Sequence, residues 1–498
     1  MENYLMKRFE ILRKETELNS IIVWPDVPYW LYLSDETIKI IQIISKHSSY
    51  SAMIEEIKLS FGTNADFSAL NQLFDELCYA GVIVSPTEKE NISQNYYVIR
   101  TVTINITDVC NLYCKHCYIN SSSQRNQFMS LHQAKVVIDS IVPYMTPSCS
   151  VIVSGGEALL NPDCIEILNY ISSTGKGKIT LVTNGTTVTE ALAEKLSKIQ
   201  RLSVQVSLDG ATPSVHEAIR GKSTFSKTIQ GINFLTKYHI RLVLSPMVTE
   251  ALLNQLEDYF SLAKKLNAIA VFLQPINNVG RARQNRLHRV RDVYVLNKLI
   301  ELYEKNPDIL KFVPGSLEAK YISSICLLSK CNNCGVGSTT LLIQPNGDLY
   351  PCPNNINSYM FLGNIFSDSF SAIWNNSKVL RELRNIDVDK NLSSDCKNCV
   401  VKHFCGGGCR GVTLQNTNNL YAKSPICAFE KEQRIEMIWI AAQKPNIFAH
   451  EVSRSLDAIN NDIIETANVI KALGYQEEVY HEERSEERRV GKECRSRW

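Results

Sequence analysis

The distribution of cysteine constrains this chain more than any other feature of its sequence. Three of its sixteen cysteines fall between Cys110 and Cys117, and nine fall between Cys326 and Cys427. Sixteen in 498 residues is too sparse for a small secreted disulfide scaffold. In a reducing compartment clustered thiols usually bind metal, whereas isolated cysteines such as Cys78 are usually small buried apolar residues. The sequence therefore predicts two metal-binding regions.

Length and charge set further limits. A chain of 498 residues is too long for a single core, so we expect two to four domains. The net charge of +2 gives no electrostatic reason to expect nucleic acid or an anionic membrane as partner. No apolar run approaches the roughly 18 residues that cross a bilayer. The charged start MENYLMKRFEILRKE also lacks the apolar stretch of a signal peptide, so we expect a cytoplasmic protein.

Shifts in composition divide the chain into successive parts. The end of the chain, residues 479–498, has too few apolar residues to join a core and resembles a translated sequencing adapter. We expect it to be disordered and non-native, and Cys494 falls within it. The other predicted parts are an N-terminal unit (1–84), a linker (85–99), an α/β core (100–312), a cysteine-rich domain (326–430) and a helical tail (431–478).

The predicted core alternates short β-rich runs with amphipathic helical stretches, such as LHQAKVVIDSIVPYM over 131–145. Six β/α units in series predict a parallel sheet, covered by helices and curled into a partial (β/α)6 barrel. In such folds the functional loops follow the C-terminal ends of the strands. The predicted strands are 101–107, 150–155, 178–184, 202–210, 241–248 and 268–276.

Directly after the first of these strands, Cys110, Cys114 and Cys117 share one loop with the spacing CxxxCxxC. This spacing lets three thiolates converge on one inorganic cluster. A 4Fe–4S cubane needs four ligands, so one iron would stay open for another molecule. A closed zinc site would need a fourth protein ligand, and the only local candidate, His116, lies badly placed between two ligand positions. Zinc and chance core cysteines are the alternatives.

The loop resembles the signature of the radical S-adenosylmethionine (SAM) superfamily, and further motifs follow in the order of that family. Each is weak alone, but each stands at a strand end or just beyond it, and together they are a strong signal. The sequence departs from the family at Ala158, where Pro is commonest. The motifs are Ser154-Gly155-Gly156-Glu157, Thr183-Asn184-Gly185, Ser207-Leu208-Asp209-Gly210 and Arg220 in HEAIRG.

The resemblance implies a catalytic role for the three cysteines, which would hold a 4Fe–4S cluster whose open iron binds SAM. An electron from the cluster would split SAM and release a 5′-deoxyadenosyl radical, which removes a hydrogen atom from the substrate. In the family, the Gly155-Gly156-Glu157 segment binds the methionine amino group and Arg220 pairs with the SAM carboxylate. The remaining implied SAM-binding residues are Asn184, Ser207 and Asp209.

The second cysteine group is the strongest signal in the sequence. Cys396, Cys399, Cys405 and Cys409 are spaced CxxCx5Cx3C, and given Cys396 the other three offsets would arise by chance with a probability of roughly 3 in 100,000. A zinc ribbon is one alternative. Further cysteines flank this array, namely Cys331 and Cys334, Cys352 in the Gx4C segment that begins at Gly347, and Cys427.

Behind a radical SAM core, residues 331–427 resemble the SPASM domain, which carries two auxiliary 4Fe–4S clusters. By position, the first cluster would be held by Cys331, Cys334, Cys352 and Cys409. The second would be held by Cys396, Cys399, Cys405 and Cys427. Cys326 rivals Cys331 as a ligand, because spacing alone does not separate them. The clusters would carry electrons, or the first would bind a substrate thiolate if one ligand were displaced.

The N-terminal unit has the pattern of two short strands followed by three helices, which suggests a winged helix-turn-helix. DNA binding is one alternative for such a fold. The third helix carries Asp66, Asp75 and Glu76 but no Lys or Arg, and a helix charged in this way would repel phosphates. A purely structural domain is another alternative. The strands are predicted over 21–27 and 29–34, and the helices near 35–46, 51–61 and 66–80.

In element order and apolar pattern, this unit resembles the RiPP recognition element, a domain of enzymes that modify ribosomally synthesised peptides. These domains bind an extended leader peptide as an added strand, beside an edge strand and against the third helix. The resemblance implies that the edge strand here lies near Tyr29–Leu33.

Together the resemblances imply a radical SAM/SPASM peptide maturase, an oxidoreductase that crosslinks a ribosomally made precursor. A thioether from a substrate cysteine is the first expectation, and a carbon–carbon bond is the second. The expected partners are the precursor peptide, whose leader binds residues 1–84, and an external electron donor such as flavodoxin or ferredoxin. No nucleic acid and no membrane are expected.

Two other functions remain open. An anaerobic sulfatase-maturing enzyme oxidises Cys or Ser to formylglycine, but that branch typically carries Asp directly after the cysteine at 352. This chain has Pro353 there. A zinc-containing winged-helix regulator is the alternative from another class, and it would contain neither iron nor sulfide.

Overall fold

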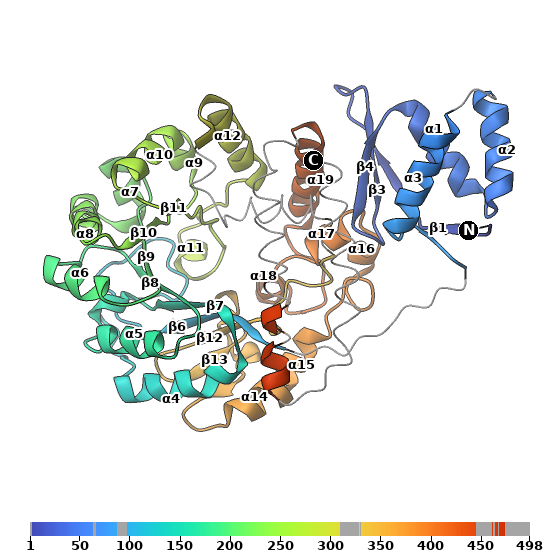
Figure 1. Cartoon of the computed structure of the whole chain (residues 1–498). Helices are drawn as coiled ribbons and strands as arrows, with labels where there is room; N and C mark the ends of the chain where they lie inside the picture. Colours follow the sequence, from blue (N-terminus) through green and yellow to red (C-terminus); the bar gives the residue numbers. More distant parts are fainter. Residues whose placement is uncertain are drawn as a thin grey trace.

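The computed structural model describes residues 2–62, 66–86, 97–308, 328, 330–444, 461, 464–466 and 468–473. Cys326, Cys494, most of the predicted linker and the whole of the predicted non-native end lie outside these residues. The described chain forms an N-terminal unit, a β/α core and a cysteine-rich domain. The cysteine-rich domain lies between the other two (Figure 1).

A three-stranded antiparallel sheet lies near the start of the N-terminal unit, after the short strand β1 (Leu5–Met6). Its strands are β2 (Glu10–Leu12), β3 (Ser20–Trp24) and β4 (Tyr29–Leu33). They pair in the order β2-β3-β4, so β4 is an edge strand, as the sequence predicted. β2 was not predicted, because three residues are too few for a periodic signal.

Three helices follow this sheet at the predicted positions. The first begins at Asp35 because Ser34 caps it, its hydroxyl accepting a hydrogen bond from the Thr37 backbone at 3.4 Å. Ile38, Ile41 and Ile44 then recur at helical spacing and are buried. The helices are α1 (Asp35–Lys46), α2 (Tyr50–Phe61) and α3 (Phe67–Tyr79), and β5 (Ile83–Val84) returns to pair with β1.

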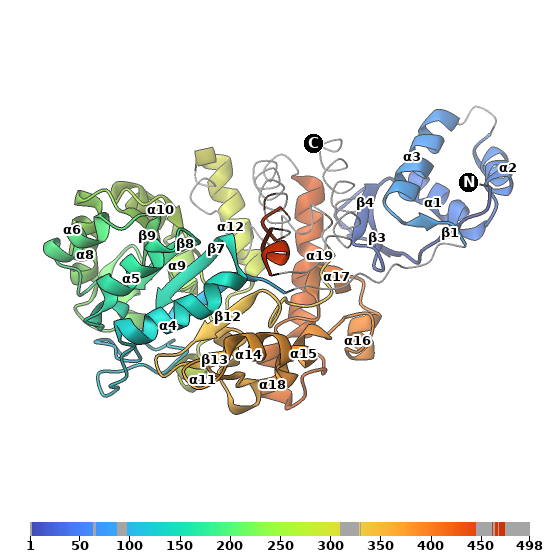
Figure 2. The same ribbon diagram turned by 60° about the horizontal axis from the view of Figure 1, so that its bottom comes forward.

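The core contains the six predicted parallel strands, paired in sequence order. Helices cover one face of the curved sheet (Figures 1 and 2). Along β8, Ile179 and Leu181 are buried while Thr180 and Val182 are half-buried, an alternation expected where only one face packs under helices. The strands are β6 (Ile99–Asn105), β7 (Met145–Ser154), β8 (Lys178–Thr183), β9 (Leu202–Val206), β10 (Arg241–Leu244) and β11 (Ala270–Val271).

Amphipathic helices connect these strands, and most of their buried residues recur at helical spacing. The α4 helix starts with a capping box in which Ser130 and Gln133 satisfy each other's backbone N–H groups. The covering helices are α4 (Leu131–Ile141), α5 (Cys164–Ser173), α6 (Glu190–Ser197), α7 (Pro213–Arg220), α8 (Phe225–Lys237), α9 (Glu250–Leu253) and α10 (Leu256–Lys265).

The sheet does not stop at the first barrel strand. β12 (Thr340–Ile343), from the cysteine-rich domain, pairs in parallel with β6, and Thr340 lies opposite Thr101. β13 (Asp348–Tyr350) and β14 (Gly363–Asn364) continue antiparallel, which makes one sheet of nine strands. The sequence predicted two separate domains, whereas the structure joins them through backbone hydrogen bonds.

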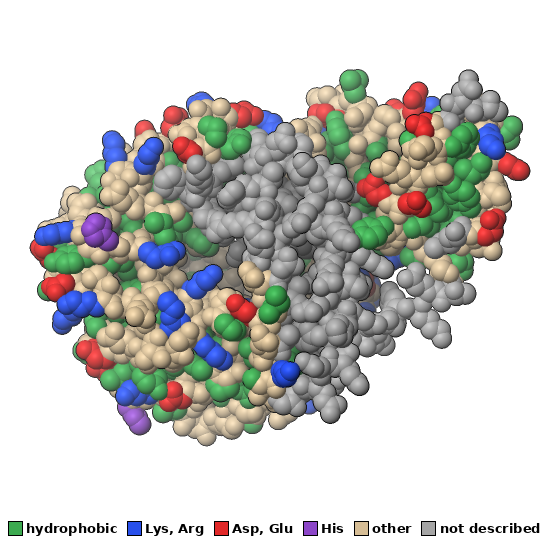
Figure 3. Space-filling model, viewed as in Figure 1, with side chains coloured by type: hydrophobic (Ala, Val, Ile, Leu, Met, Phe, Trp, Pro, Cys, Tyr) green, Lys and Arg blue, Asp and Glu red, His purple; other side chains and the backbone are tan. Residues whose placement is uncertain are grey.

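The rest of the cysteine-rich domain is built from short helices and loops (Figure 2). The predicted helical tail begins earlier than expected, because its first described helix starts at Cys427. The helices are α14 (Phe370–Asn376), α15 (Lys378–Arg384), α16 (Ser394–Lys397), α17 (Lys402–Cys405), α18 (Arg410–Thr417) and α19 (Cys427–Gln443). Every helix among the described residues is too short or too polar to cross a membrane. On the face shown in Figure 3, the described surface mixes basic, acidic and apolar side chains.

The N-terminal unit shares its hydrophobic core with the cysteine-rich domain. Trp439 of α19 is fully buried, and the ring of Tyr32 on β4 meets it edge-on at 6.0 Å between ring centroids. Lys14 lies over the same indole at 5.1 Å and pairs with Glu436 at 2.7 Å. The cores of the two parts therefore form one continuous cluster.

A buried lysine adds a polar contact to the same interface. Lys402 is 6% exposed, and its ammonium binds the carboxylates of Asp26 at 2.5 Å and Asp389 at 2.7 Å. Asp26 lies in the turn between β3 and β4 and also binds Arg8. Lys402 lies between Cys399 and Cys405, so this ion-pair network ties the turn before β4 to the second cysteine group.

Candidate active site

The three-cysteine loop lies between β6 and α4, at the C-terminal end of the first barrel strand. Burial raises the pKa of the Cys110 thiol to about 12, partly offset by a hydrogen bond from the Leu112 backbone. The negative charges of Glu157, Cys114 and Cys117 raise this pKa further, so the three thiols are close neighbours. Three soft sulfur donors grouped in a largely buried loop suit an iron–sulfur cluster, which would bind them as thiolates and release their protons.

His116, the only local candidate for a fourth ligand to zinc, is buried near Arg220, Asp209 and Arg281. Its pKa is lowered to about 4, first by burial and then by the charge of Arg220, with Arg281 contributing in the same direction. Nδ1 of His116 has no hydrogen-bond partner among the described residues. Among all the residues that the structure describes, no group of three or more His, Cys, Asp or Glu side chains is arranged to hold a single metal ion.

The two glycines after β7 pack directly against the backbone of the cysteine loop. A Cβ on Gly155 would lie 2.2 Å from the Thr107 carbonyl oxygen, and one on Gly156 would lie 2.1 Å from that of Val109. The Gly156 and Glu157 backbone N–H groups bond to these same two carbonyls at 2.9 and 2.8 Å. The role of this segment in binding the methionine amino group stays a prediction, and the structure shows that its glycines let the backbone just before Cys110 approach closely.

The carboxylate of Glu157 links the ends of β7 and β8. It is buried, accepts hydrogen bonds from the Thr183 hydroxyl and the Asn184 backbone, both at 2.7 Å, and has a pKa that burial raises. The Asn184 side-chain amide donates to Asn111, which lies in the cysteine loop, at 2.9 Å. The predicted residues Glu157 and Asn184 thus converge beside the cysteines, together with Asn111, which the sequence did not single out.

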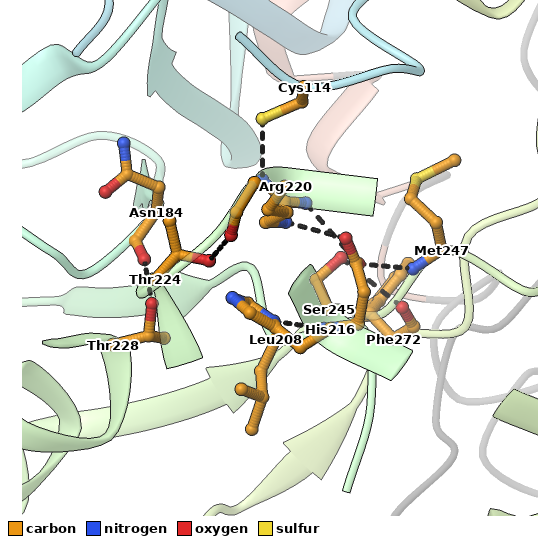
Figure 4. Close-up of polar contacts among 12 residues, drawn as sticks. Cys114, Asn184, Leu208, His216, Arg220, Thr224, Thr228, Ser245, Met247 and Phe272 are labelled. Atoms are coloured by element: carbon orange, nitrogen blue, oxygen red, sulfur yellow. Dashed lines mark hydrogen bonds and ion pairs between the residues drawn. The ribbon is translucent and has the colours of Figure 1, made fainter. Parts of the chain in front are cut away.

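Asp209 and Arg220 form a buried ion pair next to Cys114 (Figure 4). Arg220 Nε donates to Asp209 at 2.7 Å, and its Nη1 lies 3.9 Å from the sulfur of Cys114. The Met247 backbone also donates to Asp209, at 2.8 Å. Although burial opposes it, the Arg220 charge holds the pKa of Asp209 below its ordinary value. Both residues are predicted SAM-binding residues, and the structure shows that Asp209 also binds Arg220.

His216 was missed by the sequence analysis and supports the same pair. The Asp209 backbone N–H donates to His216 Nδ1 at 3.1 Å, so a neutral ring carries its proton on Nε2. Burial is the main cause of a lowered His216 pKa of about 4. Ser207 lies at the end of β9, where its backbone N–H donates to Thr183 at 3.0 Å.

The four cysteines assigned to the first auxiliary cluster lie together. Burial raises the pKa of Cys352 to about 12, and the charges of Cys409 and Cys334 raise it further. Burial likewise raises the pKa of Cys331 to about 11, followed by the effect of Cys334. Asn355 donates to the Cys352 sulfur at 2.9 Å.

The four cysteines assigned to the second auxiliary cluster line one cavity. Lys402 and Glu430 are also part of its wall. Burial raises the pKa of Cys405 to about 12, and the Glu430 carboxylate adds to this effect. The four cysteines are Cys396, Cys399, Cys405 and Cys427.

Three consecutive glycines join these two sites. Gly406, Gly407 and Gly408 separate Cys405 from Cys409 and have left-handed φ values of 60°, 81° and 74°. A Cβ on Gly406 would lie 2.6 Å from the sulfur of Cys331, and one on Gly408 would lie 2.6 Å from the Glu430 carboxylate. Only glycine lets the chain pass between the two cysteine groups at this distance.

Comparison with known families agrees with this arrangement. The profile of the Radical SAM superfamily matches residues 104–263, which include the three-cysteine loop and strands β7 to β10. The profile of the SPASM iron–sulfur cluster-binding domain matches residues 334–400.

Curated relatives are moderately similar. Mycofactocin maturase MftC of Mycobacterium tuberculosis is 28% identical over 330 residues, which cover 66% of this chain and 82% of MftC. The antilisterial bacteriocin subtilosin biosynthesis protein AlbA of Bacillus subtilis is 29% identical over 344 residues, which cover 67% of this chain and 72% of AlbA. An AdoMet-dependent heme synthase of Methanosarcina barkeri is also 29% identical, so identity at this level does not separate substrates.

Among solved structures, native anSMEcpe with bound AdoMet superimposes with a TM-score of 0.56 at 20% identity. The match covers 70% of this chain and 98% of the anSMEcpe chain. At this identity the likeness is one of fold.

Proposed function

The chain carries a radical SAM domain followed by a SPASM domain, and from this premise we propose that it modifies a ribosomally made precursor peptide by radical chemistry. A 4Fe–4S cluster held by Cys110, Cys114 and Cys117 would supply the electron that splits SAM. Clusters on the eight C-terminal cysteines would bring the total to three. The names of two relatives, a mycofactocin maturase and a subtilosin biosynthesis protein, support a peptide substrate.

The residues around the cysteine loop would bind and orient SAM. Glu157, which lies at the end of β7, would accept hydrogen bonds from the methionine ammonium, and Arg220, beside Cys114, would pair with its carboxylate. Asn184 and Ser207, at the ends of β8 and β9, offer polar groups to the rest of the molecule. Asp209, which would also contact SAM, and His216 would keep Arg220 in place.

The observation that carries the peptide assignment is β4, an edge strand fixed against the cysteine-rich domain. A leader peptide would add to β4 as a fourth strand, because extended peptides commonly extend an exposed sheet edge. The neighbouring α3 approaches β4, since Glu76 accepts a hydrogen bond from the Tyr29 hydroxyl at 2.6 Å. We therefore assign residues 1–84 as a winged-helix recognition element for the leader.

A thioether is the crosslink we propose first. Its formation removes two hydrogen atoms from the peptide: the 5′-deoxyadenosyl radical takes one from carbon, and the cysteine thiol loses a proton while one electron leaves. An auxiliary cluster on the C-terminal cysteines would accept that electron. A soluble donor such as flavodoxin or ferredoxin would supply the electron for SAM cleavage. A carbon–carbon crosslink has the same hydrogen balance.

The test is an anaerobic reaction of the reconstituted full chain with SAM, a reductant and the small cysteine-containing peptide encoded next to its gene. Mass spectrometry should show the loss of two hydrogens, and alkylation of the product should show that the cysteine thiol is gone. Hydrogen exchange should show protection of β4 by the whole peptide but not by the peptide without its leader. SAM cleavage without any change in peptide mass would contradict the proposal.

The same measurements separate the rival functions. Formylglycine formation would leave an aldehyde in the peptide and no crosslink, and it is disfavoured because Pro353, the first residue of a short 3-10 helix, replaces the expected Asp. A zinc-bearing regulator would contain zinc and no sulfide. Three clusters predict about twelve irons per chain.

A further inference from the structure

Helix α11 (Gly280–Gln284) follows the last barrel strand and lies against the three-cysteine loop. The Arg281 backbone N–H donates to the Cys117 carbonyl at 3.0 Å, and the Asn285 side chain donates to that of Lys115 at 2.9 Å. Gly280 has a left-handed φ of 54°, and a Cβ there would lie 2.4 Å from the Cys117 carbonyl oxygen. The helix is therefore fitted closely to the backbone that carries the cysteines.

The Arg281 side chain adds three more contacts to this loop. It is 2% exposed, its Nε donates to the Cys114 carbonyl at 2.7 Å, and its Nη1 donates to that of Ser121 at 2.8 Å. The guanidinium also stacks on the Tyr113 ring at 4.0 Å from the ring centroid. The Arg281 side chain therefore contacts the loop at three places: before Cys114, between Cys114 and Cys117, and after Cys117.

The charge of Arg281 has no partner of opposite sign in the described part of the chain. Arg220, whose Nη1 lies 3.9 Å from the Cys114 sulfur, is neutralised by Asp209, whereas the hydrogen bonds of the Arg281 side chain go only to backbone carbonyls. Burying a charge without a counter-charge is unfavourable. A cluster held by the loop as thiolates would carry the negative charge that balances Arg281.

We propose that Arg281 is both the counter-charge and a positioning residue of the SAM-binding cluster. Its N–H groups fix the backbone of the cysteine loop, and its charge offsets the negative charge of the ligated cluster. A fixed cation beside a redox centre stabilises the reduced form, so Arg281 raises the midpoint potential of that cluster. This inference goes beyond the proposed peptide chemistry and does not depend on it.

The test compares Arg281→Met with Arg283→Met in the full chain after anaerobic reconstitution. Arg283 lies on the same helix but is exposed, so it controls for loss of an arginine from α11. The readouts are iron content and the midpoint potential of the electron paramagnetic resonance signal that changes when SAM is added, because only a cluster with an open iron responds to SAM. We expect Arg281→Met to shift this potential to a more negative value or to lose the iron of one cluster. Arg283→Met should match the wild type.

Arg281→Lys separates the two roles. Lysine keeps the positive charge, but it cannot reproduce the paired hydrogen bonds to the Cys114 and Ser121 carbonyls or the stacking on Tyr113. We expect a potential near that of the wild type and faster loss of the cluster to a chelator. Wild-type iron and potential in Arg281→Met would overturn the proposal. Cluster loss in the Lys variant as complete as in the Met variant would overturn the counter-charge role. No peptide is present, so either failure would leave the proposed peptide modification standing.

Discussion

At the scale of single residues, two guanidinium groups contact Cys114, that of Arg220 at its sulfur and that of Arg281 at its carbonyl, and only the first has a counter-charge. Arg220 is paired with the Asp209 carboxylate, which is itself held by the Met247 backbone and placed by His216. Its charge is balanced whether or not a cluster is bound. Among the described residues, Arg281 donates to backbone carbonyls and stacks on Tyr113 but pairs with no carboxylate, so the cysteine loop meets one cation that is already compensated and one that is not.

Asp209→Asn tests the compensated pair. We expect it to lower the free energy of unfolding by about 3–5 kcal/mol, because a buried Arg220 would lose its counter-charge. Urea unfolding of the reconstituted protein measures this change. Glu194→Gln, which removes an exposed pair with Lys198, is the control and should show no measurable change. Equal stability of the two variants would contradict the role given to Asp209.

Gly406→Ala tests the glycine segment between the auxiliary sites. The new Cβ would meet the Cys331 sulfur, so we expect loss of iron from the first auxiliary site in addition to backbone strain. Gly175→Ala isolates the strain alone, because Gly175 also has a left-handed φ, of 73°, but a Cβ added there would have no atom within 4 Å. Iron and sulfide analysis of both variants distinguishes loss of the cluster from the effect of backbone strain alone. Equal iron content would show that the close approach is not required.

The sequence was sufficient to predict residues whose spacing follows from cluster ligation. It was not sufficient to predict residues whose role depends on how distant segments pack together. The three loop cysteines and the CxxCx5Cx3C array could be predicted, because ligand spacing leaves a regular pattern. Asn111, His216 and Arg281 carry no such pattern, since each acts on a segment distant in sequence or on a backbone carbonyl. Asp209 was predicted from its motif, but its ion pair with Arg220 was not, because the sequence does not show that the two side chains meet.

At the scale of elements, the six barrel strands could be predicted because each is a short β-rich run between amphipathic helices. β12 could not, since its four residues are a short apolar run and its partner β6 lies more than two hundred residues earlier. The edge position of β4 was predicted correctly. The packing of β4 on α19 was not predicted, because the amphipathic pattern of a helix does not show which strand that helix covers.

Trp439→Ala tests the contact between α19 and the N-terminal unit. Removing a fully buried indole should lower the free energy of unfolding by about 3–5 kcal/mol. Because Tyr32 on β4 would lose its aromatic neighbour, hydrogen exchange in β4 should also become faster. Tyr294→Ala, at a side chain 55% exposed, is the control. Unchanged exchange in β4 would indicate that the N-terminal unit is stable without α19.

At the scale of the whole molecule, the N-terminal unit, the cysteine-rich domain and the barrel are not separable modules. Deleting residues 1–84 would uncover Trp439 and leave Lys402 without Asp26, so lost activity after such a deletion would not report on leader binding alone. Hydrogen exchange on the intact chain avoids this difficulty. It also leaves the second cysteine group in its native surroundings.

The pairing of β12 with β6 also has a consequence for biosynthesis. On the ribosome, β6 emerges early but keeps one edge without its neighbour until residue 343 has left the exit tunnel. Exposed strand edges promote intermolecular pairing, so the nascent barrel is vulnerable for most of its translation. Slow elongation or a shortage of chaperones should therefore reduce the yield of soluble chain more than the stability of the finished protein would suggest.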